Sequence, residues 1–350
     1  MSLPSREDAR STMRAAVYYR NDDVRLEEIP IPRPGPGELL IRTVASGICG
    51  SDVMEWYRVK TAPRVLGHEV TGEVVEVGPG VEDHEVGERV FVSHHVPCNR
   101  CRYCLNGDHT VCDTLRRTNF DPGGFSEYIR IPRINVNAGT YRLPEEMSYE
   151  EGVFIEPLGC VLRAQRLAKV EPGKTVLIVG SGISGLLHVQ LAIAMGAGKV
   201  FATDIHEYRM EAARRFGAEV IPSADGLPAS LLEANDGRLV DRVIVCTGAP
   251  PAVEAAFRCA DRGGIVQLFA PTSPEYRCNL NLYHLWHEQI TVLSSYGAAP
   301  VDLRRSIDLL CLKRVNVRDM ITHRVALEEI GKGFRLVAEA GESIKVIVSP

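Results

Sequence analysis

The sequence predicts a two-domain α/β protein, in which a mainly antiparallel β domain accompanies a doubly wound parallel sheet. From residue 13 to about 141, short apolar runs alternate with glycine and proline, as in strands joined by loops. After Pro144, strand-like runs alternate with helical stretches of about 10 to 15 residues, which is typical of parallel βα units. The 350 residues are also enough for about two domains.

The antiparallel domain follows a polar segment, residues 1–13, which we expect to be frayed. Its predicted strands are the short runs AAVYY, ELLIRTVAS, EVVEV, RVFVS and FSEYIRIP. The tail, 298–350, contains two helical stretches and a last strand, IKVIVS. Because the tail is too short for an ordinary domain, we expect its strand to return to the β domain.

The parallel domain is expected over 166–297. A helix over 150–169 precedes the apolar strand KTVLIVG and the helix SGLLHVQLAIAMG. The same order then repeats along the chain, with the strand KVFATD, the helix EYRMEAARRFGA, the extended AEVI, the strand VDRVIVCTG, the helix PAVEAAFRCADRGG and the strand GIVQLFA. This alternation predicts helices that cover a parallel sheet.

A glycine-rich turn between the first strand and helix of this domain predicts a dinucleotide site. The motif GxGxxG permits a tight turn, close approach of a pyrophosphate and close helix packing, and the helix N-terminus attracts phosphates. Asp204, which ends the next strand, can accept hydrogen bonds from a ribose diol and would repel an additional phosphate. NAD is therefore favoured, although two basic residues shortly afterwards keep NADP open. The predicted cofactor-binding residues are Gly180, Gly182, Ile183, Ser184, Gly185, Asp204 and Arg209.

Four of the ten cysteines share the spacing CxxCxxCx7C over residues 98–112. Four thiolates can surround zinc tetrahedrally and leave no open position, so this site is predicted to be structural. An iron–sulfur cluster also takes four thiolates, but its common bacterial spacing has proline after the last cysteine, where this chain has Asp113. Crowding and a reducing compartment disfavour disulfides. The predicted ligands are Cys98, Cys101, Cys104 and Cys112.

The stretch GHEVTGEVVEVGPGV, residues 67–81, suggests a second metal site, because His68 and Glu69 stand at the start of an apolar alternation. A catalytic zinc takes about three protein ligands and keeps one position open. Possible partners are Cys49 in GICGSD and Glu156 in FIEPLG. Each has a structural alternative, as a buried thiol or as an acid at a helix N-terminus. Spacing alone does not bring such distant ligands together.

Residues 67–81 fit the pattern GHExxGxxxxxGxxV, and the chain resembles the zinc-containing medium-chain dehydrogenase/reductase (alcohol dehydrogenase) family. GICGSD, the four-cysteine loop, EPLG and the glycine turn stand in that family's order, so the resemblance extends from about residue 13 to the end. It implies a GroES-like catalytic domain, 13–165 and 298–350, and a Rossmann NAD-binding domain, 166–297. It also implies one catalytic and one structural zinc ion per chain.

The resemblance assigns roles to individual positions. Cys49 and His68 match ligands of the catalytic zinc, and Asp52 matches the carboxylate that orients His68. Ser51 matches the hydroxyl that starts a proton relay, and His95 matches a histidine near the substrate. Two glutamates match the acidic pair beside the metal in the polyol and threonine branches, and which of them binds the ion stays open. The implied catalytic residues are Ser51, Glu69 and His95, and the implied catalytic-zinc ligands are Cys49, His68, Glu69 and Glu156.

One position departs from the family. Threonine and sorbitol dehydrogenases usually carry a histidine five residues after the cysteine ligand, where this chain has Met54. Methionine cannot relay a proton, so the route from Ser51 must use water, the nicotinamide ribose or another residue. His94, beside His95, is a second candidate near the substrate, and the alternative for this pair is an ordinary polar loop. Met54 also counts against threonine as the substrate.

The resemblance implies NAD-linked oxidation of an alcohol to a ketone. EPLG and the lack of a long insertion near residue 120 resemble the polyol and threonine branches, and polar residues near the expected pocket favour a polyol, sugar or cyclitol. The alternatives are an L-threonine 3-dehydrogenase-like enzyme or a simple secondary alcohol dehydrogenase. From another class, the chain could be a zinc- and NAD-binding scaffold or sensor without turnover.

Composition limits the partners. With 45% hydrophobic and 24% charged residues and a net charge of −5, the chain gives no electrostatic reason to expect nucleic acid or an anionic membrane surface. It shows neither a signal-peptide pattern nor a run of about 18 apolar residues, so we expect no membrane span and a cytoplasmic location. The expected partners are a small hydroxylated substrate and further copies of the chain, as a homodimer or homotetramer.

Overall fold

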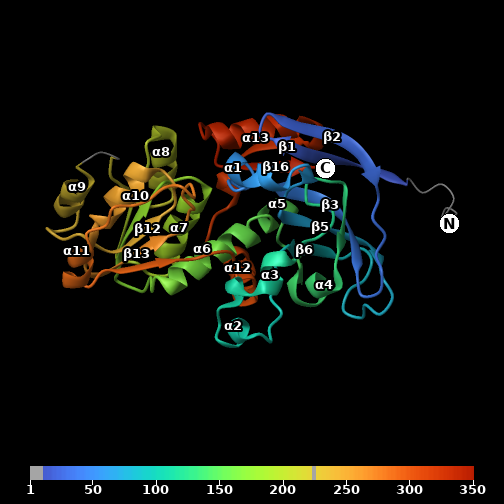
Figure 1. The fold of residues 1–350 in the computed structure, drawn as a ribbon, viewed down its shortest axis with the longest axis horizontal. Coiled ribbons are helices and arrows are strands. Elements are labelled where there is room, and N and C mark those ends of the chain that lie inside the picture. The colour runs from blue at the N-terminus through green and yellow to red at the C-terminus, as the bar shows by residue number, and fades with distance from the viewer. Residues whose placement is uncertain (1–10, 223–225) are drawn as a thin grey trace. The chain divides into compact units, whose positions relative to one another are not determined.

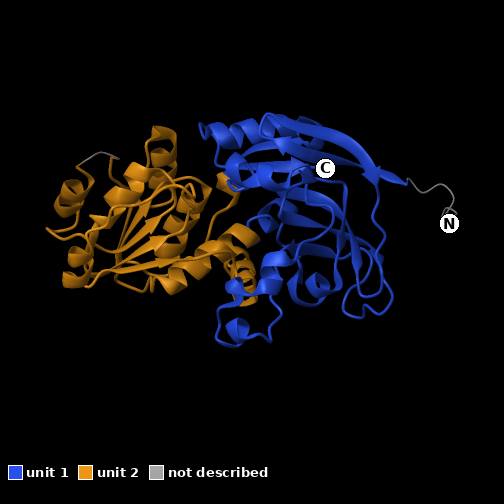
Figure 2. Cartoon of the chain, viewed as in Figure 1, with its two compact units in different colours: residues 1–155, 321–350 blue, residues 156–320 orange. Residues whose placement is uncertain are grey.

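The computed structural model describes residues 11–222 and 226–350, and the chain forms two compact units (Figure 2). One unit comprises 1–155 and 321–350, and the other comprises 156–320. These limits differ from those expected at 165 and 298. The helix after residue 155 bonds within the second unit, where Gln165 Nε2 donates to the backbone oxygen of His188 at 2.7 Å. The residues just before 321 also bond within the second unit, because Gln190 Nε2 donates to the backbone oxygen of Asn316 at 3.1 Å.

The first unit is built mainly from β-strands (Figure 1). They are β1 (Thr12–Arg20), β2 (Asp23–Pro30), β3 (Leu39–Gly47), β4 (Arg64–Val65), β5 (Glu69–Val77), β6 (Arg89–Ser93), β7 (Tyr128–Ile131), β8 (Thr140–Arg142), β15 (Ile321–Ala326) and β16 (Lys345–Ser349). One sheet has the order β2-β1-β4, and the other has the order β15-β16-β3-β5-β6-β8, with β7 also paired to β3. Among the described strands of this unit, only β15 and β16 pair in parallel. The predicted mainly antiparallel domain is confirmed.

Short helices and an amphipathic C-terminal helix complete this unit. They are α1 (Glu55–Arg58), η2 (Val59–Thr61), α2 (Arg102–Leu105), η3 (His109–Val111), α3 (Asp113–Arg117), α4 (Arg133–Gly139), α5 (Tyr149–Gly152), η5 (Leu327–Glu329) and α13 (Ile330–Glu339). Phe334 of α13 packs on Tyr18 and Phe125, with ring centroids 5.7 and 5.9 Å away. The last strand does return to the β domain, since Ile347 of β16 pairs with Gly47 of β3.

The N-terminal segment differs partly from the expected frayed tail. Residues 1–10 lie outside the described part of the chain, but Thr12 and Met13 already belong to β1, paired with Pro30 and Ile29 of β2. The Met13 side chain is fully buried. Strand pairing and burial of this one apolar residue therefore outweigh the polar character of the segment around it.

The second unit is a six-stranded sheet in which every strand pair is parallel (Figure 1). Its strands are β9 (Thr175–Val179), β10 (Lys199–Thr203), β11 (Glu219–Val220), β12 (Val240–Val245), β13 (Ala260–Leu268) and β14 (Thr291–Ser294). Their order, β11-β10-β9-β12-β13-β14, confirms the predicted doubly wound sheet. Its helices are α6 (Ile155–Leu167), α7 (Ile183–Ala194), α8 (Glu207–Arg215), α9 (Leu227–Ala234), α10 (Pro250–Phe257), α11 (Leu282–His287), α12 (Pro300–Cys311) and η4 (Arg318–Met320).

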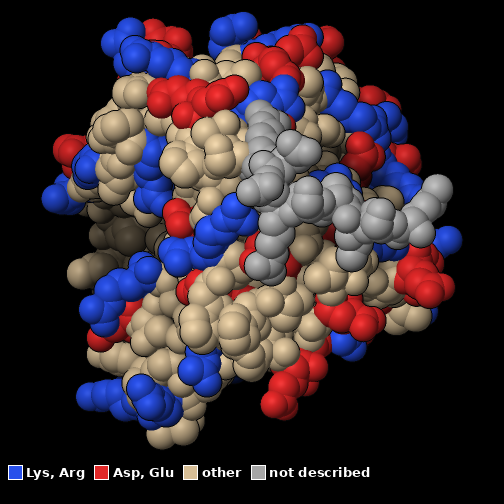
Figure 3. Space-filling model, turned by 90° about the vertical axis from the view of Figure 1, so that its right-hand side faces the viewer, with Lys and Arg blue, Asp and Glu red and all other residues tan. Residues whose placement is uncertain are grey.

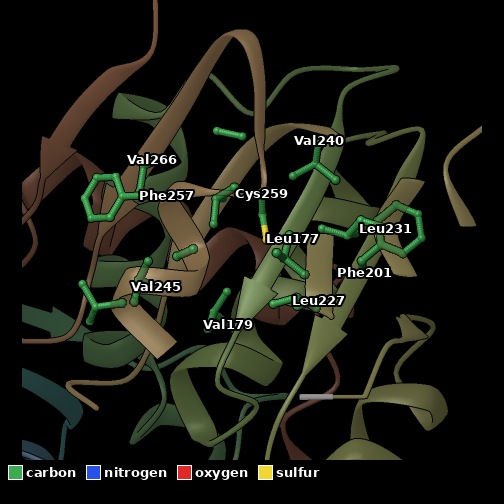
Figure 4. Packing of buried hydrophobic residues seen from close by; sticks show 14 of the residues in the cluster. Leu177, Val179, Phe201, Leu227, Leu231, Val240, Val245, Phe257, Cys259 and Val266 are labelled. Carbon is green, nitrogen blue, oxygen red and sulfur yellow. The ribbon is translucent and has the colours of Figure 1, made fainter. Parts of the chain in front are cut away.

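The core of the second unit lies between the sheet and its covering helices. Figure 4 shows Leu177 of β9, Phe201 of β10 and Leu231 of α9 in one buried cluster. The strands are apolar on both faces because helices cover both, and all five side chains of β9 are buried. This rigid support fixes the turn that follows β9.

One predicted helix was too long. The segment 251–264 was expected to be helical, but α10 ends at Phe257 and β13 begins at Ala260. Ala260 is buried and pairs with Val240, and the register shifts before Arg242 pairs with Ile265. This bulge accommodates residues that helical periodicity alone had assigned to the helix.

Charged residues on one face of the protein are mixed in sign. Figure 3 shows lysine and arginine interspersed with aspartate and glutamate over the face that it presents. Within the described residues, none of the helices has both the length and the apolar character needed to cross a bilayer.

Candidate metal centres and nucleotide turn

The four cysteines of residues 98–112 converge as predicted. One sulfur from each lies within 4.8 Å of the other three. The Sγ atoms of Cys98 and Cys112 are 3.6 Å apart, and those of Cys101 and Cys104 are 3.5 Å apart, so these thiols face one another without forming disulfides. Four soft sulfur donors around one point fit a tetrahedral zinc ion.

Backbone groups prepare this loop to hold negative charge. The N–H of Cys101 donates to Cys98 Sγ at 3.3 Å, and the N–H of Cys98 donates to Cys112 Sγ at 3.5 Å. Burial alone would raise the pKa of Cys112, but hydrogen bonds from the Cys98 and Leu115 backbones outweigh it and lower this pKa to about 6. The pKa of Cys104 moves the other way, to about 12, because burial and its contacts with Cys101 and Cys112 disfavour its thiolate, so a metal bound here would have to displace that proton.

A second donor cluster comprises Cys49, His68 and Glu69, whose ligand atoms also lie within 4.8 Å of one another. Antiparallel pairing of β3 with β5 places Gly47 opposite Glu69. The turn after β3 carries Cys49, and the residue before β5 is His68, so strand register brings together ligands that are 19 residues apart in the sequence. A thiol, an imidazole and a carboxylate are all zinc donors, and three of them fit a site with an open position.

Asp52 contacts two members of this cluster, Cys49 and His68. Its buried carboxylate accepts from the Cys49 N–H at 3.0 Å and lies 3.4 Å from His68 Nδ1. The contact at Nδ1 leaves Nε2 of His68 to face a metal. Burial alone would lower the pKa of His68, but Asp52 and Cys49 raise it well above its usual range. The geometry is the one that the resemblance implied for Asp52.

Glu69 has a partner that the sequence analysis missed. Its carboxylate pairs with the ammonium of Lys345 on β16, and both side chains are almost fully buried. Lys345 Nζ also lies 3.4 Å from the backbone oxygen of Ile48. A Cβ at Gly47 would collide with both side chains, so glycine is needed there. The available signal was a single charge, Lys345, inside the apolar run IKVIVS.

Ser51 also has a partner that sequence reasoning missed. Arg58, at the end of α1, donates from Nη2 to Ser51 Oγ at 2.9 Å and from Nε to the Ser51 backbone oxygen at 2.8 Å. Arg58 Nη2 further lies 3.2 Å from Asp52 Oδ1. The helix that carries Arg58 begins at Glu55, and the backbone oxygen of its N-cap residue, Met54, accepts from Arg58 N. One guanidinium therefore connects the hydroxyl with the carboxylate behind His68.

Two neighbouring histidines approach this cluster from the end of β6. The rings of His94 and His95 are 3.8 Å apart, and the His94 ring is 4.9 Å from that of His68. Burial, with added repulsion from His68 and Arg58, lowers the pKa of His95 to about 4. Burial also lowers the pKa of His94 well below its usual range. Both imidazoles are therefore neutral near pH 7 and can bond to a neutral hydroxyl.

Glu156, the remaining predicted ligand, opens the second unit in the first turn of α6. The thiol of Cys160 donates to its Oε1 at 3.4 Å. Its role toward a metal stays a prediction.

The glycine turn of the second unit has the geometry of a phosphate cradle. Gly180 has φ of +95°, and a Cβ on Gly185 would collide with the Gly180 backbone oxygen. Gly182 precedes the 12-residue helix α7, and the N–H groups at this helix start fit an anion. These features fit the pyrophosphate of a dinucleotide.

Asp204 lies beside this turn and is oriented by two backbone donors. Its Oδ2 accepts from Ser181 N at 2.7 Å, and its Oδ1 accepts from His206 N at 2.9 Å. A carboxylate has about four acceptor sites, so Asp204 retains capacity for ribose hydroxyls. The Arg209 guanidinium lies close to Gly182, with Nη1 3.8 Å from the position of a Cβ there. Ile183 and Ser184 form the first turn of α7.

Two protein-family models match this chain. The model described as alcohol dehydrogenase GroES-like domain matches residues 35–141, and the model described as zinc-binding dehydrogenase matches residues 184–311. Sorbitol dehydrogenase of Gallus gallus is 32% identical, and the match covers 95% of each chain. L-threonine 3-dehydrogenase of Pyrococcus abyssi is 34% identical, over 92% of this chain and 94% of that protein.

Solved structures of dehydrogenases also superpose on nearly the whole chain. Galactitol-1-phosphate dehydrogenase of Escherichia coli superposes with a TM-score of 0.84 at 29% identity, over 97% of this chain and 100% of that chain. An Escherichia coli alcohol dehydrogenase complexed with NADH superposes with a TM-score of 0.87 at 26% identity, over 97% and 100% of the two chains.

Proposed function

The chain belongs to the zinc-binding alcohol dehydrogenase family, and we propose that it oxidises a secondary hydroxyl of a polyol, sugar or cyclitol to a ketone with NAD. The resemblance noted from the sequence is thereby confirmed, down to relatives in the polyol and threonine branch. The convergence of Cys49, His68 and Glu69 carries the proposal. Zinc held at this cluster would supply Lewis acidity that lowers the pKa of an alcohol, and NAD would supply the hydride acceptor.

The protein's own groups position the substrate and move its proton. Ser51 is proposed to accept the hydroxyl proton, since Arg58 fixes its oxygen and leaves a lone pair available. A guanidinium only donates, so Arg58 cannot take the proton onward, and neither can Met54. Water is the proposed next acceptor. Neutral His95 is proposed to hold a second hydroxyl of the substrate.

NAD is the proposed cofactor because Asp204 is buried beside the glycine turn and carries the negative charge that disfavours a ribose phosphate. Its replacement by asparagine is expected to narrow the preference for NAD over NADP, which initial rates with each cofactor would measure. An unchanged ratio would argue against this role for Asp204.

The choice between Glu69 and Glu156 as the catalytic-zinc ligand can be tested directly. Lys345 competes with a metal for Glu69, so we propose that Glu156 holds the ion or its water in the resting protein. Glu156→Gln should then weaken retention of the catalytic zinc more than Glu69→Gln does. The reverse order in a chelator competition would make Glu69 the ligand.

A substrate panel tests the function. Polyols, cyclitols, L-threonine and simple secondary alcohols would each be incubated with the zinc-loaded protein and NAD, and reduced nicotinamide would be followed by its absorbance. Oxidation of threonine alone would replace the polyol proposal. No response to any alcohol, together with one zinc ion per chain, would favour the scaffold, whereas an enzyme should hold an ion at each of the two donor clusters.

We propose a homo-oligomer formed through the open edge of the parallel sheet. The edge strand β14 neighbours only β13 in the sheet order, and α11 exposes Leu282, Tyr283 and Trp286 by 73%, 67% and 73%. A second copy would cover both. Trp286→Lys is expected to reduce the mass found by light scattering, and an unchanged mass would exclude this surface. We also propose a reducing compartment such as the cytoplasm, since none of the ten cysteines, all within the described residues, forms a disulfide.

A further inference from the structure

Two arginines lie near the Cys49, His68 and Glu69 cluster, and one of them has no anionic partner in the described chain. Arg58 and Arg64 are both partly buried. Arg58 bonds to Ser51 and Asp52 through Nε and Nη2. Among residues 11–222 and 226–350, the Arg64 side chain makes neither a hydrogen bond nor an ion pair. Arg64 precedes His68 by only four residues, in the strand β4.

The charges around Arg64 do not balance. Burial lowers the pKa of Arg64, and so does the nearby charge of Arg58. Asp52 acts in the opposite direction and raises this pKa. Asp52 already bonds to the Cys49 N–H and to Arg58, and it also lies beside His68. Two guanidiniums therefore share one carboxylate, and both stay charged at neutral pH.

Other acidic groups nearby do not compensate this charge. Glu69 is paired with Lys345. Glu55 is exposed to solvent and accepts from the backbone N–H of Asn21 at 3.1 Å. A partly buried cation without a counterion is unfavourable, and an anionic ligand would relieve that cost.

We propose that Arg64, together with Arg58, forms an anion-binding subsite beside the metal cluster, and that the substrate is a polyol that carries a phosphate ester. The inference rests on the proposed alcohol oxidation and specifies its substrate class. A guanidinium presents parallel N–H donors that match phosphate oxygens. The rings of His94 and His95 lie beside the cluster, with the His94 ring 4.9 Å from that of His68, and can bond to hydroxyl groups. The site thus offers separate groups for the two ends of a phosphorylated polyol.

The kinetic test compares sorbitol 6-phosphate with sorbitol at low salt. Charge-assisted hydrogen bonds contribute enough that we expect kcat/KM to be at least about tenfold higher for the phosphate ester. Arg64→Gln should lower kcat/KM for sorbitol 6-phosphate much more than for sorbitol, and so remove this preference. Lys60→Gln, which removes an exposed charge from the same segment, is the matched control and should preserve the preference. Equal use of both alcohols by the unmodified enzyme would overturn the inference and leave the proposed function standing.

The phosphates of the dinucleotide are the other possible source of such an anion. If they were the ligand, Arg64→Gln would raise the KM for NAD and leave the ratio between the two alcohols unchanged, which would overturn the substrate assignment. We expect the KM for NAD to stay within about twofold.

Direct binding separates this subsite from the proposed reaction. Inorganic phosphate should raise the melting temperature of the zinc-loaded protein but not that of its Arg64→Gln variant, because ligand bound to the native state stabilises it. The same shift in both proteins would contradict the subsite. If no alcohol is oxidised but the phosphate shift depends on Arg64, the subsite stands and the proposed function fails.

Discussion

The two donor clusters of the first unit differ in how the sequence encodes them. The four-cysteine loop draws every ligand from residues 98–112 and stabilises its sulfurs with its own backbone N–H groups. The second cluster takes Cys49 from the turn after β3 and His68 and Glu69 from the start of β5, so it exists only when those strands pair in the correct register. One site is local, and the other depends on the tertiary structure.

The clusters also differ in what surrounds them. In the loop, four equivalent sulfurs face one another, and this arrangement satisfies a structural ion. In the second cluster, each non-sulfur donor has its own buried partner, Asp52 for His68 and Lys345 for Glu69. Charged partners of this kind orient ligands and adjust their affinity for the metal and for protons. The difference supports the proposal that one site holds a loop in place and the other performs chemistry.

The sharpest test of this comparison removes one sulfur from the second cluster. Cys49→Ser should lower kcat/KM by at least about a thousandfold, because the Lewis acid is lost or misplaced. Metal analysis should show loss of one zinc ion per chain, while circular dichroism stays unchanged. Cys311→Ser, at a half-buried cysteine on α12 outside both donor clusters, serves as the control and should keep full activity. Substantial activity without the second zinc would contradict a catalytic role.

The next test concerns the buried ion pair. Lys345→Met should lower the free energy of unfolding by about 3 kcal/mol, because it leaves the Glu69 carboxylate buried without a counterion. Adding Glu69→Gln should restore most of that loss, which would show that the effect comes from the unpaired charge. Urea denaturation would measure both.

Lys332→Met, on α13, is the control for the ion-pair test, because the exposed ion pair of Lys332 with Glu329 of η5 should contribute less than about 1 kcal/mol. If the single Lys345 variant were as stable as the unmodified chain, the ion pair of Lys345 with Glu69 would not contribute to the free energy of unfolding.

Sequence reasoning predicted the local features of this molecule better than the long-range ones. The spacing of Cys98 to Cys112 and the glycines of 180–185 each specify a site within one short segment, and the structure shows both geometries. The cluster around His68 could be assembled only by family resemblance, because strand register is not visible in spacing. Arg58 and Lys345 were missed for the same reason, since each meets its partner through a helix or strand placed by the fold.

Replacing Asp52 is expected to have a smaller effect, on zinc affinity, because Asp52 contacts Cys49 and His68 but is not itself a proposed zinc ligand. Asp52→Asn should weaken zinc binding at the second cluster about 10- to 100-fold, because the amide no longer supplies negative charge to His68. Competition with a chromogenic chelator would resolve the two ions. The four-cysteine ion should be unaffected, and equal weakening of both would show that the sites are not independent.

The smallest effect on turnover is expected from the four-cysteine loop. Cys112→Ser should release the structural ion and make the loop sensitive to protease, yet kcat per folded molecule should stay within about twofold, since separate sites act nearly independently. The loop follows the histidine pair after only Val96 and Pro97, and Val96 N donates to Oγ1 of Thr118, which lies six residues beyond the loop, at 2.9 Å. Any residual effect should therefore reach the substrate through His95 and appear as a raised KM. A fall in kcat comparable to that of Cys49→Ser would mean that the loop shapes the reacting centre, and the distinction between a holding site and a chemical site would fail.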